Sequence, residues 1–244
     1  MARINFEHEG TKGIYQIITS ENHLRPREQF EKFINVALFS LARRDDLYLE
    51  EIKSLSKNIL DNYARVLALL FSMTEKDYLG DVFNATMSSG ALGQFFTPEH
   101  ISDFMAQIQS PEKIEKRECR DFVTVADNCC GSGRMLMSFF KIRKDAIFFA
   151  KDIDHLCVKM ATINFAVRGM NAVVRWGNGL TDEVWKMYET GFDGKSFLRI
   201  IDVPQEEKKE DKKENIKTEK EVEQKIEKSG EAEVLMPVLQ KTLF

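Results

Sequence analysis

The chain has 244 residues, 43% of them hydrophobic, and a formal net charge of −4 at pH 7. This length and composition are sufficient for one packed domain with a small additional region. They exclude a protein with too few apolar side chains to form a core. The slight acidity gives no overall field that attracts nucleic acid, so a contact with DNA needs a local basic patch or a basic partner. No apolar run approaches the about 18 residues of a membrane-spanning helix, and the N-terminus has no apolar signal region.

The cysteines and histidines form no pattern typical of a metal site. Cys119, Cys129, Cys130 and Cys157 show no Cys-x-x-Cys spacing, and the four histidines are scattered singly. Zinc ligation needs convergent ligands, usually at short paired spacings, so no metal is expected. Two adjacent cysteines are also a poor disulfide framework, which favours a reducing compartment. We therefore expect a soluble, cytoplasmic protein that has no membrane contact.

The first part of the chain is expected to be helical. Residues 1–24 are polar and unpatterned. Apolar residues then recur at three- and four-residue steps over 30–41 and again over 52–70, with Asp45 and Asp46 between the two runs. Such spacing places each set on one face of a helix. Two packed helices are predicted.

After Pro111 the pattern alternates between short apolar runs and helical runs. Asp154 is placed as the N-cap of one such helix, and Gly169 as its C-terminal stop. Strands alternating with helices predict βαβ units and a parallel sheet flanked by helices, which is an α/β fold. The strands are predicted at 122–126, 146–150, 172–176 and 197–201, and the helices at 135–142 and from about 154 to 168.

The C-terminal segment has a different composition. From Glu206 to Lys228 almost every residue is Glu or Lys, with alternating signs and few apolar side chains. A solvated helix or a disordered tail over 206–244 is predicted. The alternative is a partner-binding helix, which the apolar run 234–239 would help to form.

The segment from Val125 to Gly133 carries the clearest functional signal. A predicted strand ends in Asp127, and a loop with Gly131-x-Gly133 then opens a helix. Glycines there let the backbone turn tightly and approach a ligand, and the amides at the helix start point at a polar or anionic group. The next strand ends at Asp152, where nucleotide-binding folds use an acid to bind ribose hydroxyls. This order predicts a site for an adenosine-type cofactor.

Two motifs resemble a known family. Asp127-Asn128-Cys129-Cys130-Gly131-Ser132-Gly133 resembles the D-P-A-C-G-S-G cofactor loop of N6-adenine-specific DNA methyltransferases. Upstream, Gly93-Gln94-Phe95-Phe96-Thr97-Pro98 resembles an element of the methylation (M) subunits of type I restriction-modification systems, which closes over the methionine part of the cofactor. The resemblance covers residues 25–204. It implies a Rossmann-like class I S-adenosylmethionine-dependent methyltransferase fold preceded by a small helical region.

The resemblance also implies S-adenosyl-L-methionine as the cofactor and assigns its contacts. Asp152 matches the acid that binds the ribose. Asn178, within Gly177-Asn178-Gly179-Leu180, matches a polar side chain that reads the edge of the adenine ring, with a simple turn residue as the alternative. The expected cofactor-binding residues are Phe96, Thr97, Pro98, Asp127, Cys130, Gly131, Gly133, Asp152 and Asn178.

The resulting division of the chain has four parts. They are an N-terminal extension at 1–24, a helical region at 25–110 that ends in the Gly93–Pro98 element, an α/β cofactor-binding domain at 111–205, and the charged tail at 206–244.

The catalytic motif of the family is not recognisable. Family members carry [NDS]-P-P-[YFW] after the fourth strand: its polar side chain and a proline carbonyl accept hydrogen bonds from the target amino group, and its aromatic ring stacks on the flipped base. At the matching place this chain has Asp202-Val203-Pro204-Gln205. Asp202 is therefore the candidate catalytic residue, and Gln205 offers no aromatic ring.

Three functional hypotheses remain. The first is a divergent N6-adenine DNA methyltransferase that needs a partner subunit for DNA recognition, as a homo- or hetero-oligomer. The second is a non-catalytic, cofactor-binding regulatory or decoy subunit of a restriction-modification or mobile-element system. The third is methylation of RNA, protein or a small molecule. The basic residues nearest the loop are expected to form a solvated face rather than a DNA groove; they are Arg134, Lys141, Arg143, Lys144 and Lys151.

Overall fold

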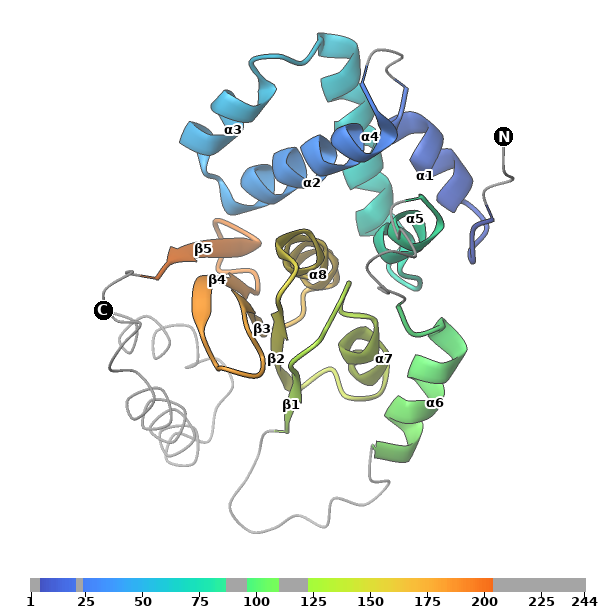
Figure 1. The fold of residues 1–244 in the computed structure, drawn as a ribbon, viewed down its shortest axis with the longest axis vertical. Helices are drawn as coiled ribbons and strands as arrows, with labels where there is room; N and C mark the ends of the chain where they lie inside the picture. The colour runs from blue at the N-terminus through green and yellow to red at the C-terminus, as the bar shows by residue number, and fades with distance from the viewer. Residues whose placement is uncertain (1–4, 21–23, 87–95, 110–122, 204–244) are drawn as a thin grey trace.

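The computed structural model describes residues 5–20, 24–86, 96–109 and 123–203, and Figure 1 shows their arrangement. The first three residues of the Gly93–Pro98 element, Phe122, Pro204, Gln205 and the charged tail lie outside the described residues. None of the helices in the described ranges is long and apolar enough to cross a membrane.

A five-stranded sheet in the order β1-β2-β3-β4-β5 forms the centre of the described chain. β1, β2 and β3 are parallel, whereas β4 pairs antiparallel with β3 and β5 pairs antiparallel with β4. The parallel strands are joined through α7 and α8, which lie on the same side of the sheet in Figure 1, as two right-handed crossovers in one direction require. The bounds are β1 Thr124–Asp127, α7 Arg134–Ile142, β2 Ile147–Asp152, α8 His155–Arg168, β3 Ala172–Gly177, β4 Val184–Thr190 and β5 Leu198–Asp202.

The predicted α/β class, with parallel strands flanked by helices, is confirmed. The expectation of four parallel strands is wrong in one respect: β4 was not predicted, and it pairs antiparallel with both β3 and β5. Residues 178–183 alone connect β3 to β4. A parallel connection needs a dozen or more residues, so this short link imposes an antiparallel return.

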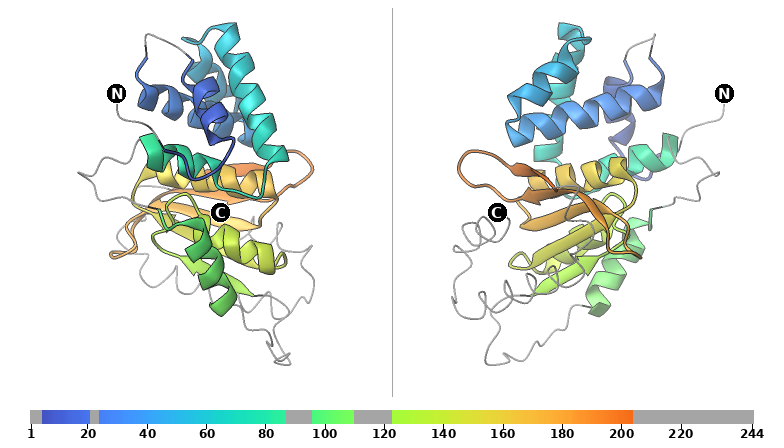
Figure 2. Two further views of the ribbon diagram at one scale, coloured as in Figure 1. Left: turned by 90° about the vertical axis from the view of Figure 1, so that its right-hand side faces the viewer. Right: turned by 60° about the vertical axis from the view of Figure 1, so that its left-hand side comes forward.

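One face of the sheet packs against α8 to form the main core. Phe148, Val174 and Tyr188 share that face and are at most 1% exposed. Ten of the 14 residues of α8 are buried, so the helix is covered on nearly all sides. Figure 2 shows the reason: α8 lies between the sheet and the N-terminal helices, of which α2 (Pro26–Ala42) packs against it.

The N-terminal region contains more helices than the sequence predicted. Asp45 and Asp46 begin a separate helix, in whose first turn acidic side chains are favourable, and Ser56 caps the next through a 3.4 Å bond from the Ile59 amide. The expectation of two helices was wrong for this reason. Residues 1–24 were left without a pattern, yet they contain α1. The bounds are α1 Thr11–Ile18, α3 Asp45–Ile52, α4 Lys57–Ser72, α5 Tyr78–Thr86 and α6 Glu99–Gln109.

Both predicted ends of α8 are confirmed. The Asp154 side chain accepts a 2.8 Å hydrogen bond from the Leu156 amide, as an N-cap does. Gly169 ends the helix in the left-handed conformation, with φ +66°.

His155, the first residue of α8, is expected to make the protein sensitive to acid. Its ring stacks on Trp176 with the centroids 4.0 Å apart, and its Nε2 lies 2.8 Å from the Tyr188 hydroxyl. Burial, and then the charges of Lys159 and Lys186, lower the pKa of His155 from 6.5 to about 4. A depressed folded-state pKa means that the neutral ring contributes stability above pH 6.5 that is lost as the pH falls toward 4.

We therefore expect the free energy of unfolding to decrease by about 1–2 kcal/mol over that interval, a value reduced for partial solvent screening. Urea midpoints measured at intervals from pH 7 to pH 4 check this. His155→Gln should flatten that part of the profile. A variant with the same slope as the wild type would assign the pH dependence to other groups.

Candidate cofactor site

Residues 127–133 form a loop between the carboxyl end of β1 and α7. Two hydrogen bonds donated by backbone amides of this loop fix it to the end of β2. The Cys130 amide donates to the Lys151 carbonyl at 3.0 Å, and the Gly131 amide donates to Asp152 Oδ2 at 2.8 Å. Gly131 and Gly133 have φ of +54° and +86°, values that glycine adopts without strain. No described side chain caps the start of α7, where amides of a helix first turn can receive a polar ligand group.

Two further segments from distant parts of the sequence meet this loop. A Cβ at Gly131 would lie 2.8 Å from the Phe96 ring, so that ring packs directly on the loop. A Cβ at Gly179 would lie 2.8 Å from the Asn128 carbonyl oxygen, which brings the loop after β3 to the same place. The structure thus brings together the three regions that the sequence assigned to the cofactor.

Asp152 is the buried acid of the site. It is 9% exposed, and it accepts hydrogen bonds from the Gly131 amide at 2.8 Å and from the Asp154 amide at 2.9 Å. Burial raises the pKa of Asp152, the two amides oppose that rise, and the charges of Asp154 and Asp127 add to it. The ends of β1 and β2 therefore hold three neighbouring carboxyl groups.

The other predicted site residues contribute in different ways. Asp127 Oδ1 accepts a 3.0 Å bond from the Cys129 amide and so shapes the loop. The Cys130 side chain is 5% exposed and belongs to the core, and burial raises the pKa of its thiol, so this residue reaches the site through its backbone. The Thr97 carbonyl accepts a 3.0 Å bond from Arg134 Nη1, and the exposed Pro98 begins α6, since its carbonyl accepts the first amides of that helix.

The turn interpretation of Asn178 is confirmed. Its Oδ1 accepts hydrogen bonds from the amides of Leu180 at 2.9 Å and Thr181 at 3.4 Å. The role in reading an adenine ring stays a prediction.

Ile153 is a site residue that the sequence reasoning missed. It lies between the two acids Asp152 and Asp154 and is 60% exposed. An exposed apolar side chain directly beside the acid that is predicted to bind ribose offers a surface on which a planar ring can pack. The sequence feature that could have indicated this residue is an isoleucine between two acidic residues at the end of a predicted buried strand.

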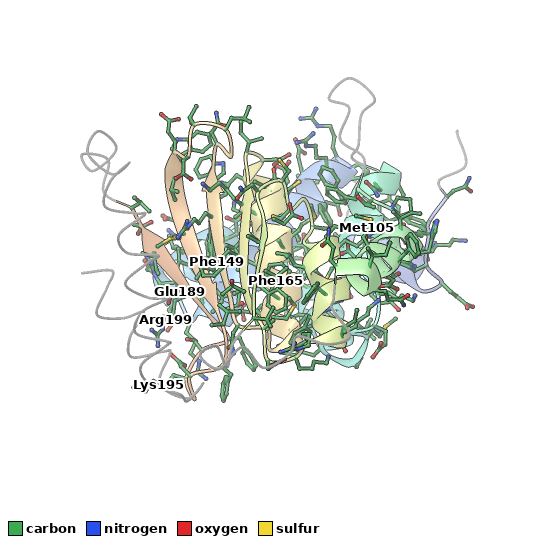
Figure 3. All side chains as sticks on the ribbon, turned by 90° about the horizontal axis from the view of Figure 1, so that it is seen from below. Met105, Phe149, Phe165, Glu189, Lys195 and Arg199 are labelled. Carbon is green, nitrogen blue, oxygen red and sulfur yellow. The ribbon has the colours of Figure 1, made fainter. Side chains whose placement is uncertain are left out.

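The structure places Asp202 away from the loop, and its catalytic role stays a prediction. β5 lies at the opposite edge of the sheet from β1, with three strands between them (Figure 1). At about 4.8 Å per strand, that separation is about 19 Å. Asp202 is exposed and forms a 3.0 Å ion pair with Lys186 on β4. In Figure 3, Lys195 and Arg199, which precede Asp202 in the chain, lie on the side of the molecule away from Met105 on α6.

The basic residues around the loop have acidic or aromatic partners within the chain. The expectation of a solvated face is wrong for Arg134 and Lys151, because both side chains are buried and Lys151 is 5% exposed. Arg134 is the most buried guanidinium among them, at 3% exposed. The partners are Asp77 and Glu7 for Arg134, Glu99 and Asp103 for Lys141, Asp145 for Arg143, the Phe140 ring for Lys144 and Asp182 for Lys151.

Comparisons with known proteins agree on the family. Residues 74–194 match the family profile described as N-6 DNA Methylase. The chain is 26% identical over 157 residues to the type I restriction enzyme MpnII methylase subunit of Mycoplasma pneumoniae, in a match that covers 59% of this chain and 26% of that protein. The chain thus spans about a quarter of the length of the curated relative that it matches.

Among solved structures, one similar fold is a putative class I S-adenosylmethionine-dependent methyltransferase from Listeria monocytogenes. The TM-score is 0.47 at 14% sequence identity, over 70% of this chain and 54% of that one.

The matched residues contain α5, α6, the cofactor loop, Asp152 and the Gly177–Leu180 turn, and they end within the hairpin that follows β4. Together with the parallel strands β1 to β3 and their two helices, the match confirms the family and fold class implied by the two motifs. Through residues 74–194, this chain belongs to the N6-adenine DNA methyltransferase family, whose cofactor is S-adenosylmethionine.

Proposed function

We propose that this chain binds S-adenosylmethionine at the loop 127–133 and serves as the cofactor-binding part of an N6-adenine DNA methyltransferase. The observation that carries the proposal is the pair of carboxylates Asp127 and Asp152, which both bond to amides of the glycine loop. A phosphate-bearing nucleotide would be repelled there, because like charges in a partly buried site cost several kcal/mol (about 2–5). S-adenosylmethionine carries a sulfonium and an ammonium and has no phosphate, so the same acids favour it.

The residues at the site fit the parts of this cofactor. Asp152 has lone pairs beyond the two that the amides occupy, and these can accept ribose hydroxyls. Ile153 offers an apolar surface for the adenine ring. Asp127 is assigned to the amino-acid end, and the Phe96 ring packs on the loop at Gly131. When bound, the cofactor supplies a methyl group activated by the positive sulfonium.

The substrate that we propose is an adenine in DNA, recognised with a partner subunit. The relative from Mycoplasma pneumoniae is named a methylase subunit of a type I restriction enzyme. The basic side chains nearest the loop have partners within the chain, so a second protein is the expected source of the DNA-binding surface.

A second candidate is cofactor binding without catalysis by this chain alone. The observation that favours it is the place of Asp202 on β5, with three strands between it and β1. In α/β sheets the ligand lies outside the carboxyl ends of the strands, here beside the glycine loop that follows β1. A target base held there would be beyond the reach of Asp202.

Calorimetric titration of the full chain with S-adenosylmethionine tests the proposed function, with ATP as the matched control. We expect binding at micromolar concentration for S-adenosylmethionine and none for ATP, since the acids repel phosphates. Equal binding of both, or no binding by a folded protein, would overturn the assignment.

Transfer of labelled methyl groups to unmethylated DNA then separates the two candidates. Labelled N6-methyladenine formed by the chain alone would support an active enzyme. Cofactor binding without transfer would support the second candidate.

A further inference from the structure

A buried carboxylate behind the cofactor loop is saturated with hydrogen bonds. Asp77 directly precedes α5 and is 2% exposed. Its Oδ1 accepts from the Gly80 amide and from Asn164 Nδ2, each at 2.9 Å. Its Oδ2 accepts from the Ser132 hydroxyl at 2.5 Å and from Arg134 Nε at 3.0 Å. These four bonds use the roughly four acceptor positions of a carboxylate, so Asp77 has no remaining capacity for another ligand.

Through Ser132, these bonds hold the middle of the loop. Ser132 stands between the two glycines with left-handed φ and is 1% exposed. Its hydroxyl is held by Asp77, and its carbonyl accepts a 3.0 Å bond from Asn164 Nδ2. Glycines on both sides leave the loop backbone with wide conformational freedom, so the serine anchor limits which loop conformation persists.

The second wall of the site is attached to the same carboxylate. Arg134, whose Nε pairs with Asp77, uses Nη1 to bind the Thr97 carbonyl at 3.0 Å and Glu7 at 2.7 Å. Thr97 follows Phe96, whose ring packs on Gly131. One chain of charged hydrogen bonds therefore connects the cofactor loop to the Phe96–Pro98 segment.

Gly80, in the first turn of α5, leaves the space that the Asp77 carboxylate occupies. A Cβ at Gly80 would lie 2.0 Å from Asp77 Oδ2 and 2.6 Å from the Ser132 hydroxyl oxygen. Only a residue without a side chain leaves room for the Asp77–Ser132 contact. Gly80 and Asp77, three residues apart, are therefore both needed for this contact.

From this geometry we propose that Asp77 is a positioning residue for cofactor binding: through Ser132 and Arg134 it fixes the loop and the Phe96–Pro98 segment in the conformation that receives the amino-acid end of the cofactor. The proposal rests on the proposed function, since it concerns the same site. It assigns no contact between Asp77 and the cofactor.

Ser132→Ala is the sharpest test, because it removes one hydroxyl and leaves Asp77 with three donors. We expect the Kd for S-adenosylmethionine to rise by about tenfold, since a hydrogen bond to a charged partner is lost. The Kd for 5′-methylthioadenosine, which has the nucleoside but no amino-acid end, should stay within about twofold. Asp77→Asn should shift the affinities in the same direction and further, because an amide nitrogen would then face a donor.

Ser138→Ala is the matched control. Ser138 is also on α7, is 2% exposed and donates a 2.6 Å bond to a carboxylate, that of Asp103, away from the loop. Its S-adenosylmethionine affinity should equal that of the wild type. Thermal melting of each variant verifies that it is folded.

The outcomes separate the two proposals. A wild type that does not bind S-adenosylmethionine would overturn the proposed function, and this inference with it. A wild type that binds, with Ser132→Ala and Asp77→Asn binding equally well, would overturn the inference alone. An equal loss for 5′-methylthioadenosine would also overturn it, because the effect would then be a general loosening of the site.

Discussion

Replacing Asp152 with alanine is expected to weaken S-adenosylmethionine binding by about 10- to 100-fold, which corresponds to about 1–3 kcal/mol. The carboxylate has two functions that alanine cannot replace. It accepts the Gly131 amide and so holds the loop, and its remaining lone pairs are the proposed acceptors for the ribose hydroxyls. Calorimetric titration of the purified variant measures the change. The fold should persist, because Asp152 lies at the end of β2, outside the main apolar core.

Asp154→Ala is the control for that experiment. Asp154 is two residues away and also an acid, but its side chain accepts the Leu156 amide and caps α8. Its loss should lower the free energy of unfolding by about 1 kcal/mol and leave cofactor affinity nearly unchanged. Wild-type affinity in Asp152→Ala would remove this residue from the site. A large loss of cofactor affinity in Asp154→Ala would mean that Asp154 contributes to cofactor binding in addition to capping α8.

The order β1-α7-β2-α8-β3 could be predicted from the sequence because each element carries local signals. Short apolar runs are separated by the glycine loop 127–133 and by the Asp154 cap and Gly169 stop of α8. The predicted boundaries lie within two residues of the observed ones for each described element of this set. Local propensity and hydrophobic spacing agree here, which is the condition under which such predictions succeed.

The elements that were missed or misplaced depend on packing between distant segments. β4 contains two charged residues, and one of them, Glu189, is 5% exposed, so the apolar pattern of this strand is interrupted. α1 has eight residues, too few for a periodic signal, yet Ile14 and Ile18 are at most 2% exposed because other helices cover them. A strand was predicted at 197–201, but its neighbour is the missed strand β4, to which the short connection 191–197 joins it.

In the candidate site, too, some residues could be predicted from local sequence signals, whereas others depend on contacts between distant segments. Asp152, Gly131 and Gly133 follow from a local strand–loop–helix pattern, and the structure places them together. The network behind the loop was not foreseen, because Ser132 and Arg134 bind Asp77 across 55 and 57 positions of sequence. Buried polar groups at that separation leave no periodic trace. Only the fold shows that they meet.

Gly133→Ala is expected to destabilise the protein by about 2–5 kcal/mol, through two effects that add. The residue has φ +86°, where a Cβ is strained by about 1–2 kcal/mol. That Cβ would also lie 2.4 Å from the Phe165 ring, which is 0% exposed and has no open space into which to move. Overpacking of this kind costs about 1–3 kcal/mol. The midpoint and slope of urea denaturation give the free energy directly.

Gly169→Ala separates the two contributions. Gly169 also has a left-handed φ, +66°, but a Cβ there would meet nothing within 4 Å. Its substitution should cost about 1 kcal/mol, from backbone strain alone. The difference in unfolding free energy between the two variants then measures the cost of the contact between the added Cβ at position 133 and the Phe165 ring. That cost reports how closely α8 packs against the end of the cofactor loop. Equal losses would mean that the ring yields without cost, and that the loop owes its shape to its hydrogen bonds rather than to the core beneath it.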